Sequence, residues 1–406
     1  MKNAQGTPHF LVVLEVLALI LILVLCISQP TEKISENNSE ISSITNEEHI
    51  INQENSEEIS KETNTQTEDT ENDWKSVYSK KVLEKVDAMT LEQKVAQMFV
   101  VTPESLAGVD KVTLLGSTTQ NALNEYPIGG LVFSSINFQN KDQIESLLDS
   151  IQEYCMTEFG NSIFLMVEER GGKNGSPLAT INQYNIEPSA GKIGETGDVQ
   201  EAIDTAKAIS SYLKEFGFNM NLAPNADLAG GVDADYDNTT YSSTSSLAAM
   251  MVAETVSTYG QKEILTVMSM FPGASSGTFM SKNLREWEES DGLVYKAGMN
   301  AGVNAIMVGN IYAAAFTDGD TVLCCMSEDV VDYLRQEMDY NGILISDSFS
   351  KEIITSNYTS ADATISAICA GMDMIYCPKD FKEAYHGVLD AVAEGVISEE
   401  RIDEAV

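Results

Sequence analysis

Basic residues are scarce in this chain of 406 residues. Only 24 Lys and Arg accompany 62 Asp and Glu, which gives a formal net charge of −38. Proteins that bind nucleic acid neutralise phosphates with Lys and Arg, so this balance excludes nucleic acid as a partner. The same acidity argues against binding to an anionic membrane surface.

Cysteine and glycine motifs that hold metals or cofactors are also missing. The six cysteines form no Cys-x-x-Cys pair and no Cys/His cluster, which argues against a zinc site. Several of them lie in apolar runs, where Cys behaves as a small buried hydrophobe, so we expect no disulfide framework. No Gly-x-Gly-x-x-Gly follows the first expected strand, and we expect neither a metal nor a cofactor.

A single apolar run near the amino terminus is long enough to span a membrane. It extends from Phe10 to Ile27 and is interrupted only by Glu15. Lys2 precedes it and an acidic segment follows, so the positive-inside rule places the C-terminal bulk on the extracytoplasmic side. We predict an uncleaved signal anchor over residues 1–28, with a cleaved signal peptide as the alternative.

Residues 29–73 are rich in Glu, Ser, Thr and Asn and almost free of aromatic residues. Such a segment buries too little apolar surface to fold, and we predict an acidic disordered linker. From residue 74 to 406 the composition is that of a globular domain. A helix start is marked by Thr90 and Gln93, which have the spacing of a capping box.

Short apolar runs typical of buried parallel strands recur through this domain. They are Met98–Val101, Gly130–Phe133, Ile163–Val167, Asn219–Leu222, Ile264–Met268, Ala305–Val308, Ile343–Ile345 and Met374–Tyr376. Helical patterns lie between them, among them Asp142–Glu153, Val199–Glu215, Leu247–Tyr259, Leu284–Ala301 and Glu328–Glu337. This alternation predicts an α/β fold, a (β/α)8 TIM barrel, with a doubly wound sheet as the second choice.

Chemistry in such barrels gathers on the loops that follow each strand. The polar or flexible side chains expected there are Glu168, Arg170, Asp227, Met270, Asn310 and Asp347. Asp347 stands at the end of the seventh strand and is the first candidate for catalysis, although an Asp at that place also caps helices. An ion pair between Glu168 and Arg170 is the alternative to a ligand role for those two residues. A helix cap is the alternative for Asp227.

Seven sequence fragments fall in the order of one enzyme family on these strands. They are Met89–Phe99, Gly129–Phe133 with Asn137-Phe138, Ala223-Pro224 with Asp227, Phe271-Pro272-Gly273, Ala305-Ile306-Met307, Ser346-Asp347 and Ala370–Met374. From about Ser79 to Val406 the chain resembles glycoside hydrolase family 3, and within it the bacterial β-N-acetylhexosaminidase branch.

The resemblance implies hydrolysis of O-glycosidic bonds in N-acetylhexosamine-containing glycans, including those of the peptidoglycan type, with retention of configuration. Asp347 corresponds to the family's nucleophile and Glu168 to a sugar-binding carboxylate. Arg170, Asp227, Asn310 and Met270 are candidate substrate contacts. With the predicted anchor, the resemblance places the domain at the extracytoplasmic surface of a bacterial cell.

The chain departs from the family at the acid/base. The branch uses a His after strand five, but the family's Lys-His is Ser269-Met270 here, its strand-six His is Asn310, and no histidine lies between His49 and His386. Two hypotheses follow. Either a carboxylate such as Glu168, Glu169, Asp233 or Asp235 replaces the histidine, or the barrel is a catalytically degenerate glycan-binding or scaffold protein.

Overall fold

The computed structural model describes residues 79–172, 175–181, 188–230, 238–273, 278–317, 319 and 321–406. The expected anchor over residues 1–28 and the linker over 29–73 therefore lie outside the described residues, as do Asp233 and Asp235. Within the described ranges, no helix has the length and apolar character needed to cross a membrane.

A parallel sheet of eight strands forms the centre of the described domain. The strands are β1 (Phe99–Val101), β2 (Gly130–Phe133), β3 (Phe164–Val167), β4 (Met220–Asn221), β5 (Leu265–Phe271), β6 (Ala305–Val308), β7 (Ile343–Ser346) and β8 (Ile375–Tyr376). Neighbours in the sheet are consecutive in the chain, and β8 pairs with β1. A parallel bridge between Ile345 and Met374 brings β7 to β8 and nearly closes the barrel. The TIM-barrel prediction is confirmed, and the strand order excludes a doubly wound sheet.

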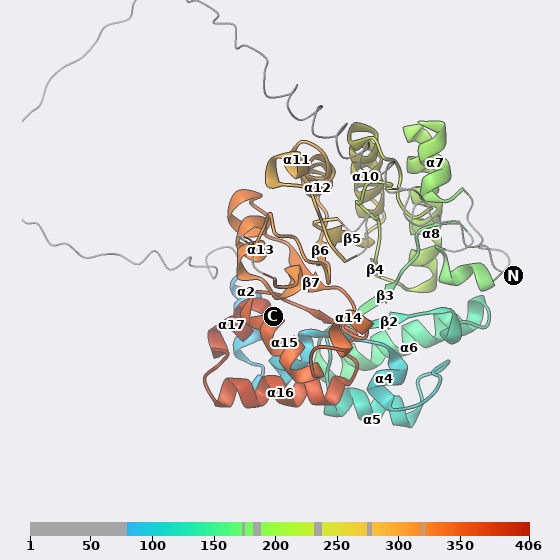
Figure 1. Cartoon of the computed structure of the whole chain (residues 1–406). Coiled ribbons are helices and arrows are strands. Elements are labelled where there is room, and N and C mark those ends of the chain that lie inside the picture. Colours follow the sequence, from blue (N-terminus) through green and yellow to red (C-terminus); the bar gives the residue numbers. More distant parts are fainter. Residues whose placement is uncertain are drawn as a thin grey trace, which may run out of the picture. The chain divides into compact units, whose positions relative to one another are not determined.

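Helices surround the barrel (Figure 1). They include α3 (Leu91–Gln97), α6 (Lys141–Phe159), α7 (Ala190–Thr196), α8 (Val199–Phe216), α10 (Ser245–Gly260), α11 (Leu284–Glu288), α12 (Asp291–Asn300), α13 (Glu328–Asp332), α14 (Glu352–Thr355), α15 (Ser360–Cys369), α16 (Phe381–Ala393) and α17 (Glu399–Ala405). The predicted capping box is present, with Thr90 and Gln93 bonding each other's backbone N–H groups.

One predicted helix is broken in the structure. The pattern from Leu284 to Ala301 predicts a continuous helix, but α11 ends at Glu288 and α12 begins at Asp291. Ser290 between them has φ −129° and ψ −90°, and its hydroxyl bonds to the carbonyl of Glu286 and the carboxylate of Asp291. Local side-chain hydrogen bonding by Ser thus competes with the helix, which periodicity alone does not detect.

The apolar core has two parts because the sheet is covered on both faces. One part fills the barrel and consists of Val100, Val132, Met166, Met220, Leu222, Val267, Ala305, Met307, Ile345 and Met374. The larger part lies between the strands and the surrounding helices. All four residues of β2 and of β6 are buried, which explains why these strands appear in the sequence as continuous apolar runs.

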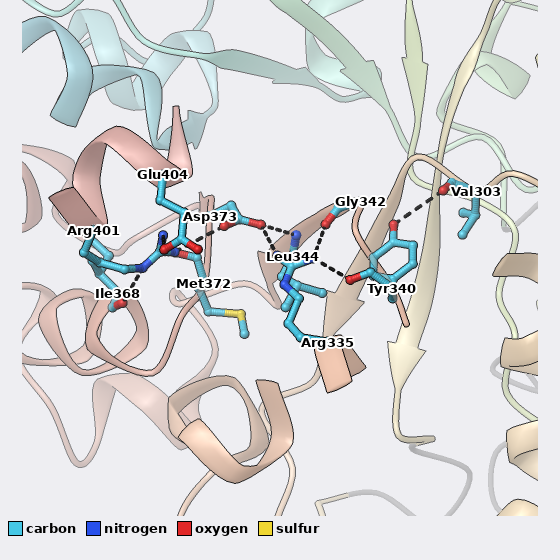
Figure 2. Close-up of polar contacts among 10 residues, drawn as sticks. All are labelled: Val303, Arg335, Tyr340, Gly342, Leu344, Ile368, Met372, Asp373, Arg401 and Glu404. Atoms are coloured by element: carbon cyan, nitrogen blue, oxygen red, sulfur yellow. Dashed lines mark hydrogen bonds and ion pairs between the residues drawn. The ribbon is translucent and has the colours of Figure 1, made fainter. Parts of the chain in front are cut away.

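An ion-pair network joins β7 to the segment that enters β8 (Figure 2). The Asp373 carboxylate accepts hydrogen bonds from the Leu344 amide at 2.8 Å, from Arg335 at 2.7 Å and from Arg401 at 3.2 Å. Arg335 also donates to the carbonyl of Gly342, which immediately precedes β7. Because the β7–β8 pairing is a single bridge, this network reinforces the closing seam of the barrel. It lies where β7 begins, at the end of the strand opposite Asp347.

Candidate active site

Asp347 lies directly after β7, at the carboxyl-terminal end of the barrel, and only 4% of its surface is exposed. Its Oδ1 accepts the amide N–H of Ser348 at 2.7 Å, and its Oδ2 pairs with Nζ of Lys351 at 2.6 Å. The next helix, α14, has Lys351 at its N-cap position. Asp347 therefore does not cap that helix, and its carboxylate is held at the barrel mouth.

Lys351 belongs to the site but was not among the residues predicted from the sequence. Its side chain is 48% exposed while that of Asp347 is 6% exposed, so the ammonium covers the buried carboxylate from the solvent side. A four-residue spacing brings side chains together on a helix, but residues 347–350 are not helical. The spacing rule therefore does not apply. A ligand that reaches Oδ2 of Asp347 has to displace this ammonium.

Glu168 and Arg170 form the ion pair that was the alternative to a ligand role, with Oε1 and Nη1 3.2 Å apart. The Arg170 side chain is 14% exposed and also donates to the carbonyl of Leu222 at 3.3 Å and to Oγ of Ser269 at 3.0 Å. Arg170 thus connects the ends of β3, β4 and β5. Ser269, where the family has Lys, serves as one of its acceptors. The Glu168 carboxylate remains 49% exposed.

Tyr376 at the end of β8 lies within the electrostatic influence of both carboxylates of the mouth. Burial, followed by the negative charges of Cys377, Glu168 and Asp347, raises the pKa of Tyr376 well above its ordinary value. Its hydroxyl therefore stays protonated near Glu168 and Asp347. The sequence indicated Tyr376 only as a strand residue, because an apolar run gives no sign of a polar tip at its end.

Asn310 and Asp227 bond to protein groups around the mouth. Nδ2 of Asn310 donates to the carbonyl of Ser348 at 2.8 Å, which ties the loop after β6 to the loop that carries Asp347. Asp227 is 1% exposed, and its Oδ1 accepts the amide N–H of Met270 at 3.3 Å and the hydroxyl of Tyr295 at 3.0 Å. These contacts fix the loops that surround the mouth.

Met270 lies at the end of β5, close to the end of β6. A Cβ atom added to Gly309 would come within 3.0 Å of Cγ of Met270, so the two strand ends pack tightly there. Met270 is partly exposed, and its side chain occupies a place where the family has a basic residue. A thioether cannot donate a hydrogen bond to a sugar hydroxyl.

Glu169 is fully buried beside the helices, in a cavity that Arg170 and Asn225 also line. Its backbone is held by Asn221, and its side chain lines this cavity of about 20 Å³ together with residues of α8 and α10 such as Ala206, Ile209 and Tyr259. Burial raises the pKa of Glu169 to about 7, against the opposite effect of hydrogen bonds from Ser176, Tyr212 and nearby backbone amides. A cavity of this size holds a single water, not a sugar. This placement does not support Glu169 as the replacement acid.

Two carboxylates thus stand at opposed places in the mouth of an eight-stranded barrel. Glu168 follows β3 and Asp347 follows β7, and three strands separate β3 from β7 in either direction around the barrel. Within the part of the chain that the structure describes, no group of three or more His, Cys, Asp and Glu is placed to hold a metal ion. The carboxyl-terminal end of a (β/α)8 barrel is where enzymes of this fold place their catalytic residues.

Comparison with known families agrees with this class. Residues 90–406 match the glycosyl hydrolase family 3 N terminal domain, and the chain belongs to this family. The resemblance inferred from the sequence fragments is therefore confirmed.

Curated relatives carry related names. A β-N-acetylglucosaminidase/β-glucosidase of Cellulomonas fimi is 27% identical over 253 residues, which cover 57% of this chain and 44% of the relative. A β-hexosaminidase A of Pseudoalteromonas piscicida is 23% identical over 332 residues, 73% of this chain and 54% of the relative. The chain thus spans about half the length of these two relatives.

Solved structures share the fold. A family 3 β-N-acetylglucosaminidase of Paenibacillus sp. str. FPU-7 superposes with a TM-score of 0.71 at 23% identity. The match covers 78% of this chain and 61% of the Paenibacillus chain. A family 3 member from Mycobacterium smegmatis gives a TM-score of 0.67 at 20% identity, covering 79% of this chain and 96% of its own.

Proposed function

We propose that the chain is a retaining glycoside hydrolase that acts on N-acetylhexosamine-containing glycans, with Asp347 as the nucleophile. The observation that carries this proposal is the placement of the family's Ser-Asp motif at the end of β7, with Asp347 held in the barrel mouth. The names of the relatives, β-N-acetylglucosaminidase and β-hexosaminidase, support the substrate class.

The hydrogen bonds of Asp347 suggest which oxygen reacts. Oδ1 is held by the backbone N–H of Ser348, so Oδ2 is the attacking atom once the Lys351 ammonium has moved aside. Oδ2 forms a bond to the anomeric carbon as the glycosidic C–O bond breaks, and the leaving oxygen takes a proton from the general acid. Water then attacks the anomeric carbon of the glycosyl ester and gives its proton to the same group, which releases the sugar and restores the Asp347 carboxylate.

Glu168 has the environment of a sugar-binding carboxylate. Its Oε1 pairs with the adjacent Arg170 guanidinium, and its half-exposed carboxylate oxygens are placed to accept hydrogen bonds from sugar hydroxyls. We therefore propose that Glu168 binds substrate in the first step. Asp233 and Asp235, the other carboxylates named from the sequence as acids, lie outside the described residues.

A leaving-group series identifies the acid. Glu168→Gln, Asp233→Asn and Asp235→Asn are compared on aryl N-acetylglucosaminides with good and poor leaving groups. Loss of the acid slows poor leaving groups far more than good ones, because an activated phenolate leaves without a proton. We expect Glu168→Gln to raise KM by the same factor for good and for poor leaving groups, as the loss of a binding residue does. A selective loss on poor leaving groups in this variant would instead make Glu168 the acid.

Turnover of an activated aryl N-acetylglucosaminide by the full chain tests the proposal directly. We expect measurable turnover that falls by orders of magnitude in Asp347→Asn, because an amide cannot form the glycosyl ester. Asp329→Asn, which changes an exposed acid at the start of α13, is the matched control and retains full activity. Equal activity of wild type and Asp347→Asn would contradict the proposal. Binding of peptidoglycan fragments without turnover would favour the glycan-binding alternative.

A further inference from the structure

Phe279 presents an aromatic ring to solvent in the segment between β5 and α11. The residue is 61% exposed, and its ring stacks on that of Tyr312 with centroids 5.1 Å apart and planes 25° apart. A single exposed apolar side chain is common on protein surfaces. An exposed ring supported from below by a second ring is a flat, rigid apolar surface, and this feature calls for an explanation.

The backbone holds both rings in place. The Tyr312 amide donates to the carbonyl of Thr278 and the Met280 amide donates to the carbonyl of Tyr312, each at 2.9 Å, in a short parallel pairing. Tyr312 also pairs with Leu323 on its other side. Single bridges thus hold the Tyr312 backbone on both sides, and the backbone of the stack is positioned before any ligand arrives.

The stack lies next to the loop that carries the proposed nucleophile. Asn310, two residues before Tyr312, donates to the carbonyl of Ser348, which adjoins Asp347. Two residues of extended chain span at most about 7 Å, so the backbone of Tyr312 lies within that distance of Asn310. The backbone of Tyr312, and of Phe279 paired with it, therefore lies near the rim of the barrel mouth on the β5–β6 side.

We infer that the Phe279–Tyr312 stack is a binding platform for a pyranose ring of the glycan. This ring is the sugar on the leaving-group side of the glycosidic bond to be cleaved. This inference rests on the proposed function. One face of a pyranose ring carries axial C–H groups, and an aromatic face carries the partial negative charge that attracts them. A preformed aromatic surface also loses little conformational entropy when it is covered. The occupant is thus a second sugar ring, bound by stacking and without a charged partner.

Three substrates with one sugar and different leaving groups test the platform. They are N-acetylglucosaminyl fluoride, an aryl N-acetylglucosaminide and di-N-acetylchitobiose. For Phe279→Ala we expect kcat/KM to fall about tenfold on the aryl and disaccharide substrates, as loss of a stacking contact does, and to stay unchanged on the fluoride. Phe279→Trp keeps an aromatic face and retains activity on all three. Val396→Ala, which trims another exposed apolar residue between α16 and α17, is the matched control.

The outcomes separate this inference from the proposed function. An equal loss on all three substrates, or no loss on any, would overturn the platform. If the wild-type chain hydrolyses none of them, calorimetry with tri-N-acetylchitotriose tests the platform without turnover, and we expect binding about tenfold weaker in Phe279→Ala. Equal binding by the two proteins would overturn it. A change in oligomeric state alone would assign the ring to self-association and overturn it as well.

Discussion

Replacing Glu169 by glutamine gives a test of the buried carboxyl group beside the barrel. Burial raises the pKa of Glu169 from its ordinary value of 4.5 to about 7, so the folded protein binds a proton at this site more tightly than the unfolded chain. The group's contribution to stability is therefore fully present below about pH 4.5 and is lost as the pH rises through 7. The shift corresponds to about 3 kcal/mol of unfolding free energy across this range.

Chemical denaturation at pH 5 and pH 8 measures the effect. From pH 5 to pH 8 we expect the unfolding free energy of the wild type to fall by about 2–3 kcal/mol more than that of Glu169→Gln. Glu168→Gln removes the adjacent carboxylate, which is 49% exposed, and is the matched control with a small effect. The same pH dependence in wild type and Glu169→Gln would refute the reasoning. Because Glu169 is buried beside the helices, Glu169→Gln retains activity, and a large loss in a folded variant would restore it as an acid candidate.

Two further predictions concern ion pairs. Lys351→Met removes the ammonium that covers Oδ2 of Asp347. We expect kcat/KM on an activated substrate to rise about two- to fivefold, because a half-exposed ion pair is worth up to about 1 kcal/mol. A tenfold fall in kcat/KM would show instead that Lys351 assists the reaction. Asp373→Ala leaves Arg335 and Arg401 without their shared partner at the barrel seam, and we expect a loss of about 3–5 kcal/mol in urea denaturation with activity retained in the folded fraction. A loss below about 1 kcal/mol would contradict the structural role of the network.

The barrel was predictable because its strands are covered on both faces. A strand with this environment is apolar at successive positions, so β2 and β6 have the predicted bounds in the structure. The helix that spans Ser290 was predicted wrongly as continuous, because its break depends on a local hydrogen bond. Propensity and periodicity carry no information about that competition.

The site was predictable only where the strands aim the side chains. The end of β7 located Asp347. Glu168, Glu169 and Arg170 lie beyond the end of β3, where no strand period separates their side chains, so the sequence kept Glu169 among the candidate acids although the structure buries it. Lys351 was not predictable, because it lies on an irregular turn where no period relates one side chain to the next. Its ion pair with Asp347 depends on the tertiary path of that turn.

The proposed mechanism depends most on Asp347 forming a covalent bond to the sugar. The direct measurement is to incubate the full chain with a fluorinated N-acetylglucosaminyl analogue that slows the second step, digest it and locate the adduct by mass spectrometry. We predict one sugar per chain, attached at Asp347 in the peptide that contains Ser346-Asp347-Ser348, and no adduct in Asp347→Asn. An adduct on another residue, or hydrolysis of the natural glycan with inversion and without any adduct, would contradict it.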